Sequence, residues 1–134
     1  KALHVIGSIY AKENNLNNCL ILNTDKQVIE ALNGNVFLVK DNVIKTPPIS
    51  TGCLKGVMRK QLIEIIISSS EYELVEEPIS PFELQKADEL FITNVIVGIQ
   101  PIHSPYIHWR ALVGLLLLGL RLLDLSALLL GWAL

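Results

Sequence analysis

The chain has 134 residues and a mass of 14.9 kDa, which is the size of one ordinary domain. Its 11 Lys and Arg against 13 Asp and Glu give a formal net charge of −2, so it lacks the positive excess typical of nucleic-acid-binding proteins. Charged residues make up 18% of the chain and the mean hydropathy is +0.45, which argues against intrinsic disorder.

The apolar excess is concentrated at one end. Residues 109–134 contain 13 Leu among 26 residues, whereas the first 108 residues carry a formal net charge of −3 and have the composition of a soluble domain. No secretory signal opens the chain, so we expect a cytoplasmic location. We divide the chain into a domain over residues 1–104 and a leucine-rich tail over residues 105–134.

The tail has three interpretations. Residues 111–134 are long enough to span a bilayer, but Arg121 and Asp124 near the middle would each cost roughly 2.5–3.5 kcal/mol on insertion. A terminal helix packed on the domain is a second possibility. We favour the third, sequence foreign to the domain, because the leucine excess begins abruptly after Pro105.

Three helices are predicted in the first hundred residues. The first covers residues 2–13, with Leu3, Ile6, Ile9 and Tyr10 at helical spacing on one face. The second runs from Gly56 to about residue 68. The third is short and starts at Pro81, with Ser80 as N-cap and Glu83 completing a capping box, and ends near residue 86 or 87.

Short apolar runs bounded by turn residues predict strands between these helices. A hairpin is expected at Asp41–Asn42, since both residue types tolerate a left-handed backbone. The order of the elements predicts an α/β fold with a mixed sheet and hairpins, rather than a doubly wound sheet. The predicted strands are residues 19–22 (buried), 28–30, 36–39, 43–44, 72–75 and 89–93, with residues 95–102 also extended.

The cysteines and histidines do not have the spacing of a metal site. Cys19 and Cys53 are far apart and are expected to be small buried side chains rather than a disulfide or a catalytic thiol. His4, His103 and His108 fit no metal-binding pattern, so no metal is expected.

Three stretches, taken in order, resemble the class IV (fold type IV) pyridoxal-phosphate enzymes, which include branched-chain and D-amino-acid aminotransferases and aminodeoxychorismate lyase. The resemblance covers about residues 1–102 and implies the family's large domain, an α/β pseudo-barrel with flanking helices. It also implies pyridoxal 5′-phosphate held between two domains of a homodimer. The stretches are VIEALNGNVF at 28–37, TPP through LKGVMR at 46–59, and ADELFITN with GIQP at 87–101.

The resemblance places Glu30 beside the cofactor's ring nitrogen. A pyridoxal cofactor acts as an electron sink when this nitrogen is protonated, and a neighbouring carboxylate favours the protonated form. Glu30 ends a predicted strand just before the turn at residues 33–35, where a side chain can face a cleft. The alternative is an exposed strand glutamate.

The cofactor phosphate requires N–H donors, which a helix N-terminus supplies. By resemblance the backbone amides of Val57 and Met58 hold it, and Gly56 permits a close approach. The alternative is that Gly52 and Gly56 only shape a loop. Arg59 is interpreted either as a charge near the phosphate or as an exposed helix arginine.

By resemblance, residues Thr93, Asn94 and Val95 match a second phosphate-contacting loop, in which Asn94 can donate through its side-chain amide and Val95 through its backbone. Many family members have Ser, Thr or Gly here, so the Asn-Val pair is a departure that puts a side-chain contact in question but not the backbone contact. The preceding acids Asp88 and Glu89 are expected to be solvated.

The family's mechanism needs a lysine that forms the cofactor's Schiff base. The resemblance places it a few residues before Lys1, with Lys1 itself as the alternative. The N-terminal domain is also absent from the match, so we expect that this chain alone does not complete turnover.

The leading functional hypothesis is a fragment of a pyridoxal-phosphate-dependent aminotransferase that moves an amino group between an amino acid and a 2-oxo acid. Aminodeoxychorismate lyase, which yields 4-aminobenzoate for folate synthesis, is the alternative within the family. A non-enzymatic remnant, inactive or anchored to a membrane and acting only by binding, is the alternative of another class.

Overall fold

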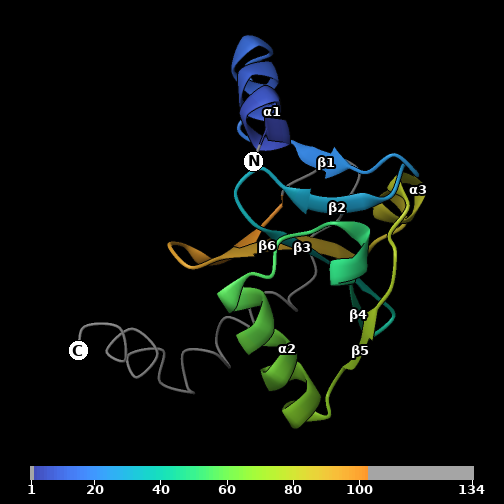
Figure 1. The fold of residues 1–134 in the computed structure, drawn as a ribbon. Helices are drawn as coiled ribbons and strands as arrows, with labels where there is room; N and C mark the ends of the chain where they lie inside the picture. The colour runs from blue at the N-terminus through green and yellow to red at the C-terminus, as the bar shows by residue number, and fades with distance from the viewer. Residues whose placement is uncertain (1, 103–134) are drawn as a thin grey trace, which may run out of the picture.

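A computed structural model describes residues 2–102 of the chain, and Figure 1 shows the course of these residues. The predictions for Lys1, His103, His108 and the leucine-rich tail lie outside the described residues. The elements are α1 (Ala2–Glu13), β1 (Leu20–Leu22), β2 (Val28–Ala31), β3 (Asn35–Lys40), β4 (Val43–Thr46), a 3₁₀ turn (Ile49–Thr51), α2 (Val57–Ser69), β5 (Glu73–Glu76), α3 (Pro81–Gln85), β6 (Glu89–Asn94) and β7 (Gly98–Pro101).

The strands form two sheets. The larger has five strands in the order β5-β4-β3-β6-β7, in which only the β4–β5 pair is parallel. The smaller is the antiparallel pair β1–β2. The predicted α/β fold with a mixed sheet, hairpins and flanking helices is therefore confirmed.

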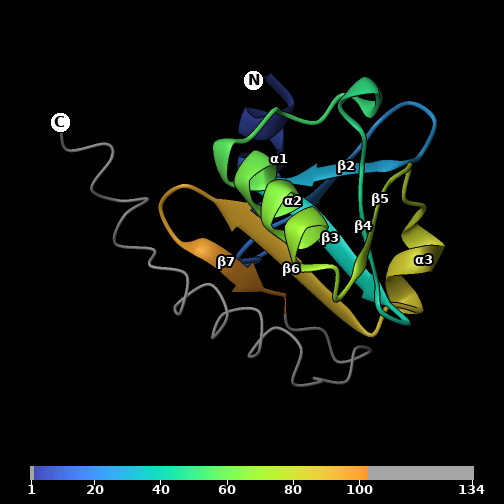
Figure 2. The same cartoon turned by 90° about the horizontal axis from the view of Figure 1, so that it is seen from below.

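Both faces of the large sheet are buried, which explains why β3 and β6 are apolar almost throughout. On one face, Phe37 stacks on Phe91 with ring centroids 5.1 Å apart, and Leu62 and Ile66 of α2 pack against this pair. Figure 2 shows α2 lying across β3 and β6. The other face packs a second apolar cluster around Ile79. Helix α2 therefore has a firmly defined position relative to the ends of β3 and β6.

Two local predictions are confirmed in detail. Asp41 and Asn42 have φ of 48° and 65°, as expected for the turn that joins β3 to β4. Ser80 accepts a hydrogen bond from the N–H of Glu83, whose side chain accepts one from the N–H of Ser80 in return. Both features involve hydrogen bonds or dihedral angles of neighbouring residues, which explains why the sequence alone predicts them.

Three burial and strand predictions need correction. Strand β1 is not buried, because only Ile21 faces the interior. Cys19, just before it, is half-buried, whereas Cys53 is buried as predicted, and both thiols are free. Residues 95–102 are not continuously extended, since a turn after Asn94 reverses the chain into β7. All three errors have the same cause: apolar character does not distinguish a core strand from an edge strand or an exposed turn.

The first helix is largely exposed. Its predicted apolar face does not pack on the rest of residues 2–102, and Ala11 is its one buried residue. Within residues 2–102, no helix has the length and apolar character needed to cross a bilayer.

Candidate functional site

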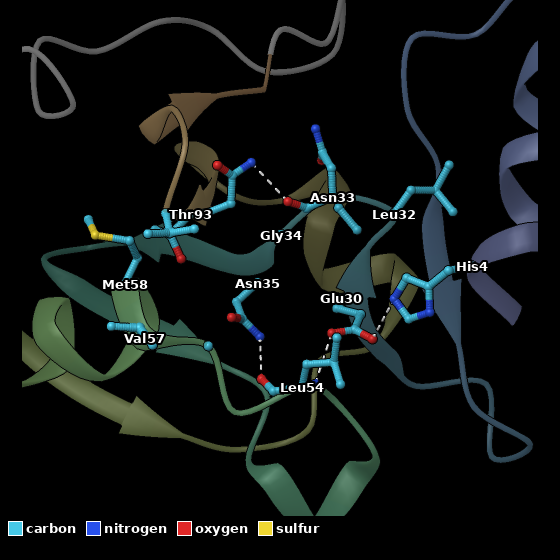
Figure 3. A pocket seen from close by; sticks show the side chains of 14 residues that line it. His4, Glu30, Leu32, Asn33, Gly34, Asn35, Leu54, Val57, Met58 and Thr93 are labelled. Atoms are coloured by element: carbon cyan, nitrogen blue, oxygen red, sulfur yellow. Dashed lines mark hydrogen bonds and ion pairs between the residues drawn. The ribbon is translucent and has the colours of Figure 1, made fainter. Parts of the chain in front are cut away.

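A cavity of about 440 Å³ opens where β2, the loop before α2 and the end of β6 meet (Figure 3). These segments are far apart in the sequence, and the sheet register brings them together. All five residues predicted to hold the cofactor line this one cavity: Glu30, Val57, Met58, Asn94 and Val95. The cavity wall also includes Thr93, from the same predicted loop as Asn94 and Val95, and His4 and Asn35, which the sequence did not single out for it.

Glu30 is buried, with 3% of its surface exposed, and both carboxylate oxygens have partners. Oε2 accepts a hydrogen bond from the N–H of Leu54 at 2.9 Å, and Oε1 lies 3.0 Å from Nε2 of His4. Figure 3 shows the carboxylate between these two groups. The prediction of a glutamate facing a cleft is thus met, and its alternative, an exposed strand glutamate, is wrong.

The start of α2 leaves its first N–H groups open to the cavity. Its N-cap is Gly56, and no side chain makes a capping hydrogen bond. The first backbone bond into the helix runs from the N–H of Lys60 to the carbonyl of Gly56. The N–H groups of Val57 and Met58 therefore lie at the positive end of the helix without an intrahelical acceptor.

Two glycines bring the cavity wall close together. A Cβ on Gly56 would overlap Oδ1 of Asn35, whose amide nitrogen donates to the carbonyl of Leu54 at 2.7 Å. A Cβ on Gly34 would lie 2.6 Å from the carbonyl oxygen of Thr93. Gly56 therefore does more than shape a loop, since it allows α2 to begin directly against Asn35 at the start of β3.

Asn94 organises the turn after β6. Its Nδ2 donates to the carbonyl of Asn33 at 2.9 Å, and its Oδ1 accepts from the N–H groups of Ile96 and Val97, both at 2.9 Å. Val95 is exposed and offers only its backbone as a polar group to the cavity. The side chain of Asn94 thus builds the loop itself.

Thr93 belongs to the loop that the resemblance places at the phosphate, and it lines the cavity. It is 1% exposed, and its Oγ1 is buried without a hydrogen-bond partner among residues 2–102.

Arg59 is not exposed, so that interpretation is wrong, and it is not among the residues that line the cavity. It is buried and donates to the carbonyl of Pro47 at 2.9 Å and to Glu76. Asp88 pairs with Lys40 at 3.2 Å, while Glu89 is 5% exposed, so the prediction of a solvated acid is wrong for Glu89. Backbone folding around α2 and β6, rather than local composition, determines the burial of both Arg59 and Glu89.

The thiol of Cys53 has an environment that fits a structural role. Burial raises the pKa of Cys53, with the positive charge of Arg59 acting in the opposite direction. Its Sγ lies 3.6 Å from the carbonyls of Pro47 and Pro48. A neutral thiol in this setting is a poor nucleophile, which agrees with the prediction that Cys53 is a buried structural side chain.

No lysine of residues 2–102 lines the cavity.

Comparison with known proteins gives a family match over most of the chain. The family model for class IV amino-transferases matches residues 2–104. A Methanocaldococcus jannaschii protein whose name proposes a branched-chain-amino-acid aminotransferase is 35% identical over 106 residues, which is 76% of this chain and 36% of that protein. This chain therefore spans about a third of the length of such curated relatives.

Solved structures share the fold. The branched-chain amino acid aminotransferase of Thermobaculum terrenum in its PLP form is 29% identical with a TM-score of 0.71, over 75% of this chain and 33% of that one. A Legionella pneumophila protein, whose name proposes a 4-amino-4-deoxychorismate lyase, has a TM-score of 0.79 at 24% identity, over 88% of this chain and 45% of that one. The family match over residues 2–104 shows that this chain belongs to the class IV aminotransferase family, whose members depend on pyridoxal phosphate.

Proposed function

We propose that residues 1–104 form the cofactor-binding part of a pyridoxal-phosphate-dependent aminotransferase that moves an amino group between an amino acid and a 2-oxo acid. One observation carries the proposal: a buried carboxylate and an uncapped helix start face the same cavity, although they come from separate segments. The carboxylate of Glu30 favours a protonated ring nitrogen of the cofactor, and the N–H groups at the start of α2 can bind its phosphate.

The residues present fit this cofactor. Glycines at 34 and 56 leave room where any Cβ would collide with the wall, and the N–H groups at the start of α2 are uncapped. When bound, pyridoxal phosphate supplies an electron sink for cleavage of a bond at the substrate's α-carbon.

Each group of the chain has a distinct task in this proposal. Glu30 would keep the ring nitrogen protonated, and its buried position strengthens the charge interaction. Val57 and Met58 would bind phosphate oxygens through their N–H groups, and Val95 would add its own N–H. Asn94 would hold the loop that presents Val95, because its amide already bonds to Asn33, Ile96 and Val97.

The amino acid substrate is proposed from the sequence relatives, whose names point to branched-chain amino acids. The lyase alternative has the support of a fold neighbour only. The proposed homodimer rests on the family resemblance alone, whereas the cytoplasmic location is an expectation from the sequence. The leucine-rich tail over residues 105–134 is proposed to be separate from the cofactor-binding domain, on its composition.

The decisive test uses the full-length protein that carries this chain. Purified protein is incubated with pyridoxal phosphate, leucine, isoleucine or valine, and 2-oxoglutarate, and glutamate formation is measured. Amino transfer that is lost in Glu30→Gln supports the proposal. Pyruvate release from aminodeoxychorismate without amino transfer would favour the lyase. Failure to bind pyridoxal phosphate would contradict both and favour a binding remnant.

A further inference from the structure

We propose that His4 is a positioning residue for the cofactor ring. Through its contact with Oε1 of Glu30, it holds this carboxylate in the orientation that meets the ring nitrogen. The inference rests on the proposed function, because that function places Glu30 beside the nitrogen. It assigns a task to a residue of α1 that lies outside the three motif stretches at 28–37, 46–59 and 87–101.

The packing of α1 directs His4 toward the cavity. Within this helix, only His4, Gly7 and Ala11 are not exposed to solvent. Their spacing of three and then four residues places them on one face of the helix, which is the face that meets the rest of the domain. His4 is the one residue of this face with a polar side chain, and Figure 3 shows its imidazole pointing at the carboxylate of Glu30.

A close approach between α1 and the turn after β2 brings His4 within reach of Glu30. A Cβ on Gly7 would lie 2.5 Å from Cδ2 of Leu32, so a larger residue at position 7 would push either α1 or Leu32 aside. Leu32 follows Glu30 by two residues and lines the same cavity. Because Gly7 lies one helical turn after His4, the small residue lets α1 settle where Nε2 of His4 is 3.0 Å from Oε1.

The carboxylate of Glu30 has one backbone partner and one side-chain partner. Oε2 accepts from the N–H of Leu54, whose own carbonyl accepts from the amide of Asn35, so this first partner is itself fixed. Oε1 is paired with His4, and no other side chain of residues 2–102 forms a hydrogen bond or ion pair with Glu30. Removal of the imidazole would therefore leave the carboxylate free to turn about its bond to Leu54.

Two donors leave this carboxylate able to bind a third. An ionised carboxylate has about four lone-pair sites, and Nε2 of a histidine can donate to one of them in the neutral as well as the charged ring. Glu30 contributes to the cavity wall, where a ring N–H is the proposed third donor. A carboxylate that is already oriented costs less to order when the ligand binds. His4 would thus raise the affinity for a ring that presents an N–H group.

The test measures binding of pyridoxine 5′-phosphate by fluorescence titration, in the full-length protein that carries this chain. This probe has no aldehyde, so its binding does not require a lysine. The matched ligand is its 1-deaza analogue, in which CH replaces the ring nitrogen and cannot donate to Glu30. We expect His4→Ala to weaken binding of pyridoxine 5′-phosphate by about five-fold and to leave the affinity for the deaza analogue unchanged. A general loss of folding would weaken both ligands alike.

Three further variants define how His4 acts. His4→Gln retains an amide that can donate to Oε1 and should recover most of the affinity. Lys12→Ala, at an exposed site of the same helix, should bind as the wild type. In a Glu30→Gln background, His4→Ala should have little further effect, because the carboxylate that it positions is no longer present.

The ring nitrogen itself supplies a spectroscopic measurement. In a probe labelled with ¹⁵N at this position, the NMR shift should report a protonated ring in wild type and His4→Gln, and a move toward the unprotonated value in His4→Ala. A merely structural role of His4 would not produce this pattern.

Other results would overturn the inference. Equal weakening of the two ligands by His4→Ala, unchanged affinity, or additive losses with Glu30→Gln would do so while leaving the proposed function intact, since the wild type would still bind the probe. Tighter binding by His4→Ala would mean that the imidazole occupies the place of the ring nitrogen. Failure of the wild type to bind pyridoxine 5′-phosphate would overturn both the inference and the proposed function.

Discussion

Nε2 of His4 lies 3.0 Å from Oε1 of Glu30, and this contact joins the first helix to the second strand at the cavity. The carboxylate side chain is 4% exposed and the histidine side chain 26%. Since Ala11 is the one buried residue of α1, the His4–Glu30 contact is a principal polar link between that helix and the sheet. It also positions the carboxylate proposed to face the cofactor ring.

Replacing His4 by Ala should lower the free energy of unfolding by about 1 kcal/mol, because Oε1 of Glu30 loses its partner in a buried position. Urea unfolding at neutral pH measures the change. His4→Gln is the matched variant, since its amide can still donate, and it should recover part of the loss. Equal stability of wild type and His4→Ala would show that the contact does not stabilise the fold.

Glu30→Gln should weaken binding of pyridoxine 5′-phosphate by about ten-fold or more, because a charge-assisted hydrogen bond to the ring is lost. The glutamine oxygen can still accept from the N–H of Leu54, so the fold should be retained. Glu73→Gln, at an exposed position of β5, is the control and should bind as the wild type. Binding of inorganic phosphate should not change in Glu30→Gln. Unchanged affinity for the phosphorylated probe would argue against a ring contact for Glu30.

Gly56→Ala should destabilise the fold by about 1–3 kcal/mol, because the added methyl group overlaps the side chain of Asn35 and pushes α2 from the sheet end. The same shift should misplace the N–H groups proposed to bind phosphate. Denaturant unfolding and phosphate titration measure the two effects. Lys60→Ala, at an exposed site of the same helix, should stay within about 0.5 kcal/mol of the wild type. A Gly56→Ala variant as stable as Lys60→Ala would mean that the stability of the fold does not depend on the close approach of Gly56 to Asn35.

The capping box of α3 should make stability depend on pH. Burial by itself would raise the pKa of Glu83, but hydrogen bonds from Lys45 and from Ser80 outweigh burial and hold the pKa below its ordinary value. A lowered folded-state pKa stabilises the fold above the unfolded-state pKa, and this stabilisation is lost as the pH falls through the folded-state value.

The difference in unfolding free energy between wild type and Glu83→Gln should therefore be largest near neutral pH and shrink as the solution is acidified. Urea unfolding over a pH series measures it, and Ser80→Ala should lose about 1 kcal/mol at neutral pH through the missing cap. A difference that grows on acidification would contradict the sign of this pKa shift.

The accuracy of the sequence predictions depends on how local each feature is. The turn at Asp41–Asn42 and the cap at Ser80 involve adjacent residues, so residue type alone indicates them. The burial of β1 and of Glu89 was predicted incorrectly, since it depends on which elements pack against them. Arg59 illustrates the same limit, because its partner Glu76 comes from a distant strand.

The sequence by itself determined the order of helices and strands, the family resemblance and the five residues expected at the cofactor. These features could be predicted from the sequence because each of them depends on residues within one short segment. Only the tertiary structure decided that those residues line one cavity, that His4 meets Glu30, and that the hydroxyl of Thr93 is buried without a hydrogen-bond partner among residues 2–102. The physical reason is that the β3–β6 register and the packing of α2 on that sheet bring these side chains together, and both arise from contacts between segments far apart in the chain.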